Sequence, residues 1–126
     1  MINMERFDVW LSAYGKCWES GDSKGITELF TDNAHYFETP FDEPMVGIKA
    51  IEQYWREGAA QAQKEVKFNF SAVAVTETKG LSHWSASFVR VPSGVQVELD
   101  GFLEAEFATD GRCSSFREWW HRKEIT

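Results

Sequence analysis

The sequence predicts an α+β domain in which three N-terminal helices pack on a strongly curved, mixed but mostly antiparallel sheet. Apolar residues recur at steps of three and four near the N-terminus, which is the period of an amphipathic helix. After Lys64 the apolar period changes from 3.6 to 2, which is the period of a half-buried strand. Short turn sequences then separate four strand-like segments, so we expect an antiparallel meander folded over the helices.

The three helices are predicted from their apolar faces and their ends. The first covers about residues 4 to 20, carries Tyr14 on its buried face and stops at Ser20-Gly21. Asp22 offers a side-chain oxygen to the free amides of a short second helix, whose buried stripe is expected to include Phe30. The third helix begins near Gly47 and continues, with weak amphipathicity, to about residue 63.

The strands are predicted from alternation and turn residues. Residues 34 to 39 have the composition of a short strand, and the prolines that follow them indicate a loop. Four longer strands lie between glycine-containing turns, at residues 65 to 78, 80 to 91, 95 to 109 and 112 to 124.

Length and charge limit the classes of protein that fit. A chain of 126 residues suits one domain, residues 1 to 126, with a sizeable buried core. The net charge of −7 opposes binding to nucleic acid, because phosphate backbones are bound through clustered Lys and Arg. The 6 Trp and 10 Phe residues make the apolar material unusually aromatic, so large flat side chains are expected to line an interior surface.

Cysteines, histidines and hydropathy predict a cytoplasmic protein with no cofactor and no metal. No stretch is apolar enough to span a bilayer, and the first ten residues lack the order of a secretory signal. Cys17 and Cys113 lie 96 positions apart without a second pair, so reduced thiols are expected. The sequence is also compatible with one long-range disulfide between them. The three histidines, at positions 35, 83 and 121, show no spacing typical of metal ligands.

A long segment of the chain resembles a known superfamily. Residues 13 to 55, AYGKCWESGDSKGITELFTDNAHYFETPFDEPMVGIKAIEQYW, are similar to the N-terminal half of bacterial ketosteroid isomerases and SnoaL-like polyketide cyclases, and match the isomerases without a gap. The segment FATDGRCSSFREWWHRK is similar to the last hairpin of many SnoaL-like members. The resemblance implies the cone-shaped nuclear transport factor 2-like fold, which encloses a pocket for small apolar molecules.

The resemblance also implies site residues. Tyr14 falls where the isomerases keep a tyrosine that stabilises an oxyanion, and Glu38 falls where they keep the aspartate that moves a proton. The isomerases have a third group, a protonated acid, four residues before the position of Phe107, and this chain has Leu103 there. A carboxyl group that faces an aromatic pocket has its charged form disfavoured, which suits Glu38 to act as a base.

The pocket walls are expected to be mainly aromatic. Tyr14 lies on the inner face of the first helix, so its hydroxyl needs a polar partner or a ligand oxygen. The residues predicted to contact a ligand are large and almost all aromatic: Trp10, Trp18, Phe30, Tyr36, Phe41, Trp55, Trp84, Leu103 and Trp119.

Two functions remain open at this point. The first is an isomerase-like or cyclase-like enzyme that moves a proton next to a carbonyl, with Glu38 as base and Tyr14 as oxyanion donor, without a metal. The second is a non-catalytic module that binds an apolar metabolite, which Leu103 favours because one oxyanion contact is missing. A protein-docking role like that of nuclear transport factor 2 has less support.

The outer sheet face is expected to form a homodimer. Trp119 and Trp120 are adjacent on one strand, so they point to opposite faces and one of them leaves the pocket, although the sequence does not say which. We expect the dimer interface to include Phe102 and that outward tryptophan. The sequence also leaves open whether His83 or Asp100 faces the pocket, although alternation favours the outer face for Asp100.

Overall fold

The first helix lies where its apolar face predicts. The computed structural model describes residues 2–125 of the chain. Helix α1 spans Met4–Ser20, and its start is capped by the Asn3 side chain, which accepts a hydrogen bond from the Arg6 amide at 2.8 Å. It ends at Gly21, whose φ of 69° is in the left-handed region that favours glycine.

The second helix is shorter than predicted. Helix α2 spans Ser23–Thr27, and the Asp22 side chain caps it by accepting from the Gly25 amide. Phe30 begins strand β1, Phe30–Phe37, so its placement on the helix was wrong. The third helix α3, Ile48–Trp55, continues as a short π-helix η1, Arg56–Ala60, and a two-residue strand β2, Met45–Val46, precedes it.

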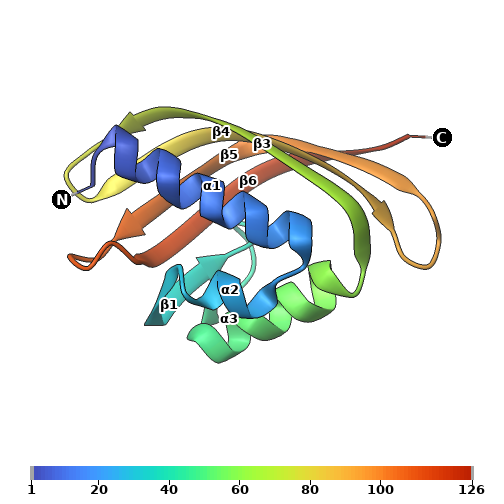
Figure 1. Cartoon of the computed structure of the whole chain (residues 1–126), viewed down its shortest axis with the longest axis horizontal. Coiled ribbons are helices and arrows are strands. Elements are labelled where there is room, and N and C mark those ends of the chain that lie inside the picture. Colours follow the sequence, from blue (N-terminus) through green and yellow to red (C-terminus); the bar gives the residue numbers. More distant parts are fainter. Residues whose placement is uncertain (1, 126) are drawn as a thin grey trace.

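The sheet has the predicted mixed, mostly antiparallel topology (Figure 1). Its long strands are β3 (Gln63–Val75), β4 (Lys79–Arg90), β5 (Gln96–Phe107) and β6 (Cys113–Ile125). The spatial order is β2-β1-β6-β5-β4-β3, and β1 runs parallel to β6 while the other neighbours are antiparallel. The predicted fold class is therefore confirmed.

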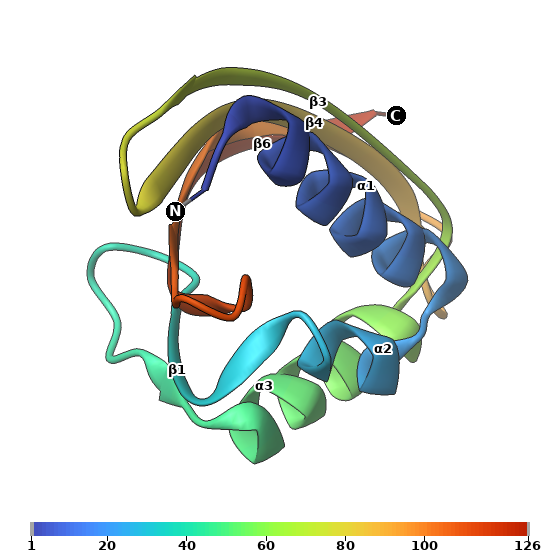
Figure 2. The ribbon, with the colours of Figure 1, turned by 60° about the vertical axis from the view of Figure 1, so that its left-hand side comes forward.

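The core lies between the curved sheet and the helices. Helix α1 runs beneath the concave face, and α2 with α3 closes the opposite side (Figure 2). The rings of Trp10, Tyr14 and Phe116 pack together, with centroids 5.3 to 6.0 Å apart. Aromatic pairs at these separations add stability beyond the area they bury, so the tryptophan-rich composition is used mainly in packing.

The described residues place no further constraint on location. None of their helices combines the length and apolar character needed to cross a membrane.

Both cysteines are free thiols, and burial raises the pKa of the Cys113 thiol well above its usual value. Cys113 is therefore unreactive as a nucleophile, because the thiolate form is disfavoured.

Gly101 permits the close approach of strands β5 and β6, so Gly101→Ala is expected to destabilise the fold strongly. A Cβ atom at this position would lie 1.9 Å from the Trp119 carbonyl oxygen and 2.8 Å from the Trp120 Cα. These are backbone atoms within a sheet ladder and cannot move aside as a flexible side chain would. We expect the free energy of unfolding to fall by about 3 kcal/mol or more, measured by urea denaturation.

Gly58→Ala is the matched control for this experiment. A Cβ atom on Gly58 would meet only the Tyr54 ring, at 3.8 Å, which is an ordinary contact. We expect its effect to stay within about 1 kcal/mol. Equal stability of the Gly101→Ala variant and the wild type would contradict the register assigned to β5 and β6.

Candidate functional site

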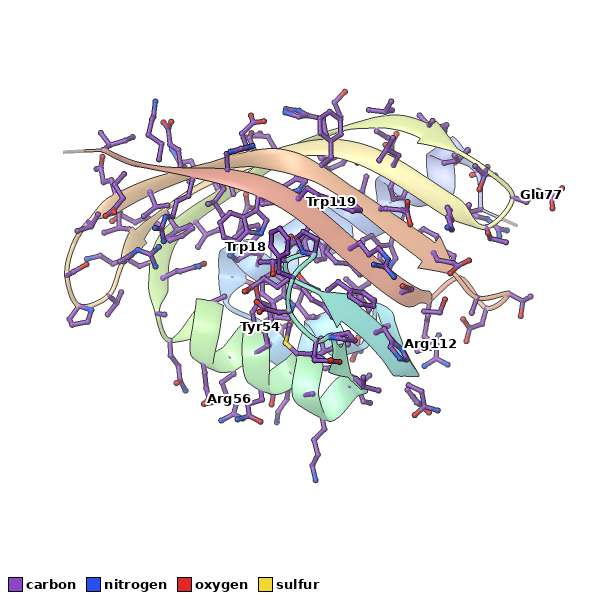
Figure 3. All side chains as sticks on the ribbon, turned by 180° about the vertical axis from the view of Figure 1, so that it is seen from behind. Trp18, Tyr54, Arg56, Glu77, Arg112 and Trp119 are labelled. Atoms are coloured by element: carbon purple, nitrogen blue, oxygen red, sulfur yellow. The ribbon has the colours of Figure 1, made fainter. Side chains whose placement is uncertain are left out.

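A cavity of about 190 Å³ lies between the concave sheet face and the helices. Its wall combines aromatic rings with polar and charged side chains. The lining residues are Tyr14, Trp18, Glu38, Tyr54, Trp55, Gly58, Ala59, Gln63, Trp84, Phe88, Arg90, Leu99, Glu118, Trp120 and Arg122. Figure 3 shows the side chains of Trp18 and Tyr54 in the space between the sheet and the helices.

A chain of hydrogen bonds leads from the cavity wall into the core. The hydroxyl oxygens of Tyr14 and Tyr36 are 3.0 Å apart, and either can be the donor. The Tyr36 hydroxyl is 3.3 Å from Glu118 Oε1. Tyr14 and Glu118 line the cavity and Tyr36 is fully buried behind them, so the two tyrosines and the carboxyl group form one connected unit.

Glu118 is the buried acid of this unit. Glu118 is only 7% exposed. Burial raises the pKa of its carboxyl group well above the usual value, and the nearby charge of Glu38 raises it further. The protonated form of this carboxyl group is therefore favoured over the charged form. The Tyr36 hydroxyl donates to Glu118 Oε1, and the Tyr14 and Tyr36 hydroxyl groups share one hydrogen bond in which either can be the donor.

Glu118 lies directly across the sheet from Leu103. The two residues are register partners on β6 and β5, and both side chains point to the concave face. The resemblance to ketosteroid isomerases implies an acid at the position of Leu103. In this chain the neighbouring strand supplies a carboxyl group to the same part of the sheet.

The tyrosines of the site are neutral hydrogen-bond donors. Burial is the main cause that raises the pKa of Tyr14, Tyr36 and Tyr54 well above the usual value, and the charge of Glu118 is the second. None of these hydroxyl groups loses its proton near neutral pH, so each can stabilise negative charge on a ligand oxygen by donating to it.

Glu38 lies at the cavity wall, just beyond the end of β1. Its side chain is half-buried rather than enclosed by aromatic rings. The Trp120 indole N–H donates to the Glu38 backbone carbonyl at 3.2 Å, which ties the segment after β1 to β6. This position makes the carboxyl group available to the cavity.

Five of the predicted site residues come together at the cavity: Tyr14, Trp18, Glu38, Trp55 and Trp84. Trp18 packs against Trp55 and Trp84, with ring centroids 5.4 and 5.9 Å apart. These three tryptophans form one side of the cavity wall.

The other predicted contacts lie outside this cavity. Four of them are buried in the core without lining it: Trp10, Phe30, Tyr36 and Leu103. Phe41 is 95% exposed, because it lies in the loop between β1 and β2 rather than on a regular element. Trp119 is 44% exposed on the outer sheet face, since strand alternation turns its neighbour Trp120 inward.

His83 and Asp100 both lie on the outer sheet face. His83 Nε2 is 2.9 Å from Asp100 Oδ1, and both side chains are substantially exposed. The pairing of β5 with β4 and β6 is continuous through Gly101, so no bulge turns Asp100 toward the cavity. Neither residue belongs to the site.

The residue types that the sequence analysis missed are mostly polar. Glu118, Tyr54, Gln63, Arg90 and Arg122 all line the cavity. Strand alternation offered one signal, because Glu118, Trp120 and Arg122 share a strand face. A carboxyl group in register with apolar inward residues would have indicated a buried acid.

The model of the SnoaL-like domain matches residues 11–116. The chain belongs to the SnoaL-like domain family. This assignment agrees with the curved sheet and the N-terminal helices, and it confirms the resemblance stated for the sequence. The search of curated proteins returned no match.

Solved structures similar to this SnoaL-like domain agree with its fold over nearly the whole length. SalBIII, an epoxide hydrolase/cyclase-like enzyme in pyran ring formation in polyether salinomycin, is 19% identical, with 96% of this chain and 95% of that chain covered and a TM-score of 0.83. RV0760c from Mycobacterium tuberculosis is 10% identical, with 99% and 100% covered and a TM-score of 0.83. A computationally designed 17-OHP binder is 14% identical, with 94% and 96% covered and a TM-score of 0.80.

Proposed function

We propose that this SnoaL-like domain is an enzyme that moves a proton next to a carbonyl group of a small molecule. The observation that carries the proposal is that Tyr14, Glu38 and Glu118 line one cavity, with Tyr14 and Glu118 connected through Tyr36. A base, a neutral oxygen donor and a protonated acid behind that donor are the groups such a reaction needs. The description of SalBIII as a cyclase-like enzyme supports catalysis rather than binding alone.

The reaction assigns one role to each group. Glu38, as a carboxylate, takes a proton from the carbon beside the carbonyl, and the C–H electron pair moves onto the carbonyl oxygen to give an enolate. Tyr14 donates its hydroxyl hydrogen to that oxygen. We propose that Glu118 in its protonated form then donates to Tyr36, and Tyr36 to Tyr14, which is the reverse of the order in the structure, where Tyr36 donates to Glu118. Return of the proton from Glu38 to another carbon, or to the same one, completes an isomerisation or an exchange.

The second candidate is a module that binds a small molecule without turnover. It is favoured by Leu103, which leaves no carboxyl group at the position where the isomerases keep their acid. The similar fold of the designed 17-OHP binder supports this candidate, because that protein is described only as a binder. In that case Glu38 and Tyr14 only orient the bound molecule.

Deuterium exchange separates these two functions. Levulinate, a small keto acid, is incubated with the protein in D₂O, and loss of its C–H signals beside the carbonyl is followed by proton NMR. The enzyme is expected to accelerate the exchange above the rate in buffer. Binding of levulinate with no acceleration, at any concentration that saturates the protein, would instead support the binding module.

We also propose a homodimer through the outer sheet face. Phe102 and Trp119 are register partners on β5 and β6, both are exposed on this face, and with Phe41 they line a surface groove. We expect sedimentation at micromolar concentration to give a dimer, and Phe102→Glu to give a folded monomer because a charge is desolvated at the interface. A monomeric wild type would remove the proposal. Ser71→Glu, at an exposed position on β3, serves as the control for added charge.

A further inference from the structure

Two indole N–H groups in the cavity wall have no protein partner. Trp55 and Trp84 are 4% and 1% exposed, and neither Nε1 atom has a hydrogen-bond acceptor among the described residues. Both rings pack against Trp18 and both line the cavity. A buried donor in a native protein normally has an acceptor, so each of these N–H groups points to an acceptor atom that a ligand brings.

The other tryptophans show that this feature is specific to the cavity. Trp10 donates to the Leu29 carbonyl at 3.1 Å, Trp18 to Gln63 Oε1 at 2.8 Å, and Trp120 to the Glu38 carbonyl. Trp119 is on the outer face, where water is available. Unpaired buried indoles therefore occur only at Trp55 and Trp84 within residues 2–125.

Two cationic side chains line the same cavity. Arg90 continues the concave face of β4 and stacks over the Phe88 ring, with its Cζ 5.6 Å from the ring centroid. Arg122 follows Trp120 by two residues on β6, so it shares the inward face. Neither guanidinium forms a salt bridge with a carboxylate in the described part of the chain, although the protein carries a net charge of −7.

The cavity volume limits the size of the ligand. Pockets for drug-sized ligands measure roughly 300 to 1,000 Å³, whereas this cavity measures about 190 Å³. Glu38 and Glu118 are the two carboxyl groups that line this cavity, and burial raises the pKa of Glu118 so that its neutral form is favoured. The wall thus combines two guanidinium groups with Glu38 and with a buried acid whose neutral form is favoured.

We propose that the ligand is a compact carboxylate with a carbonyl or ether oxygen, rather than a large apolar molecule. Arg90 and Arg122 hold the carboxylate, which suits the forked geometry of guanidinium groups. Trp55 and Trp84 donate to ligand oxygens deeper in the cavity. The assignment names the substrate class of the proposed enzyme and uses the same cavity, so it rests on that proposed function for the site but not on turnover.

A matched pair of probes tests the charge requirement. Levulinate and its methyl ester differ in one charge, and their affinities are compared by isothermal titration calorimetry. Levulinate is expected to bind roughly tenfold more tightly than the ester. Arg90→Gln and Arg122→Gln are each expected to reduce this preference, whereas Lys123→Gln, on the outer face of the same strand, is expected to retain it.

Indole NMR tests the acceptor requirement in the unmodified protein. The protein has 6 tryptophans, so a ¹⁵N-labelled sample gives a small set of indole signals that Trp→Phe variants assign. Saturating levulinate is expected to shift the Trp55 and Trp84 signals downfield, while those of Trp10 and Trp119 stay in place. This readout stays valid if an arginine variant fails to fold.

Each outcome supports or overturns the inference separately from the proposed function. Equal affinity for levulinate and its ester, or unshifted Trp55 and Trp84 signals, would overturn the carboxylate assignment even if the protein catalyses exchange of a neutral ketone. Tight levulinate binding with both indole shifts, but without deuterium exchange, would support the assignment and remove the enzyme. Tighter binding of a steroid ketone than of levulinate would also overturn it.

Discussion

Glu118→Gln is expected to stabilise the protein by an amount that grows with pH. Burial raises the pKa of Glu118 well above its unfolded value of about 4.3, so the folded state keeps a proton that the unfolded state releases. At pH values between the unfolded-state and the folded-state pKa of Glu118, the wild type loses about 1.4 kcal/mol of unfolding free energy per pH unit from this group. Glutamine has the same shape, carries no charge and keeps an oxygen that can accept from the Tyr36 hydroxyl, so it removes this loss.

The measurement is the difference in unfolding free energy between the variant and the wild type across a pH series. The difference should be constant below about pH 3, where the carboxyl group is protonated in both states, and should rise from there until the pH passes the folded-state pKa. Glu98→Gln, on the outer face of β5, is the control and should show no such rise. A difference that falls with pH would show that Glu118 is stabilised in its charged form.

Glu38→Gln is expected to lower the rate of deuterium exchange at saturating levulinate by roughly a hundredfold or more. The amide keeps the shape of the side chain and removes the base, so the affinity for levulinate should change little. Glu43→Gln is the matched control. Glu43 is exposed in the loop between β1 and β2 and does not line the cavity, so this variant removes one negative charge and should leave the exchange rate unchanged.

Tyr14→Phe completes this experiment. Removing the hydroxyl takes away the donor to the enolate oxygen, and removal of such a donor costs on the order of a hundredfold in rate. If both variants alter the affinity for levulinate and the wild type shows no exchange to lose, the cavity only binds. If Glu38→Gln exchanges at the wild-type rate, another group is the base.

The elements that could be predicted from the sequence are those with local signals. Helix α1 has a polar cap at Asn3, a glycine at its end and an apolar face, and it matches the predicted residues. The last four strands are joined by turns with clear residue preferences. Phe30 was misplaced because β1 pairs with β6 in parallel, across most of the chain, and no local turn marks that pairing.

The site was harder to predict because it depends on register between strands. Tyr14 and Glu38 came from the resemblance, but Glu118 becomes visible only when Leu103 is paired with it across the β5 and β6 hairpin. Phe41 was assigned to the pocket because it is aromatic, and its loop position places it in solvent. The unpaired indoles of Trp55 and Trp84 depend on the ring orientations of the folded chain, which no sequence pattern gives.

A crystal structure with levulinate bound tests the central claim most directly, because it locates the reacting atoms relative to Glu38 and Tyr14. We predict that the ketone oxygen lies about 3 Å from the Tyr14 hydroxyl oxygen, with the adjacent CH₂ carbon facing the Glu38 carboxylate. The chain from Tyr14 through Tyr36 to Glu118 should remain intact behind it. Levulinate bound outside this cavity, or with its ketone turned away from Tyr14, would contradict the proposed site.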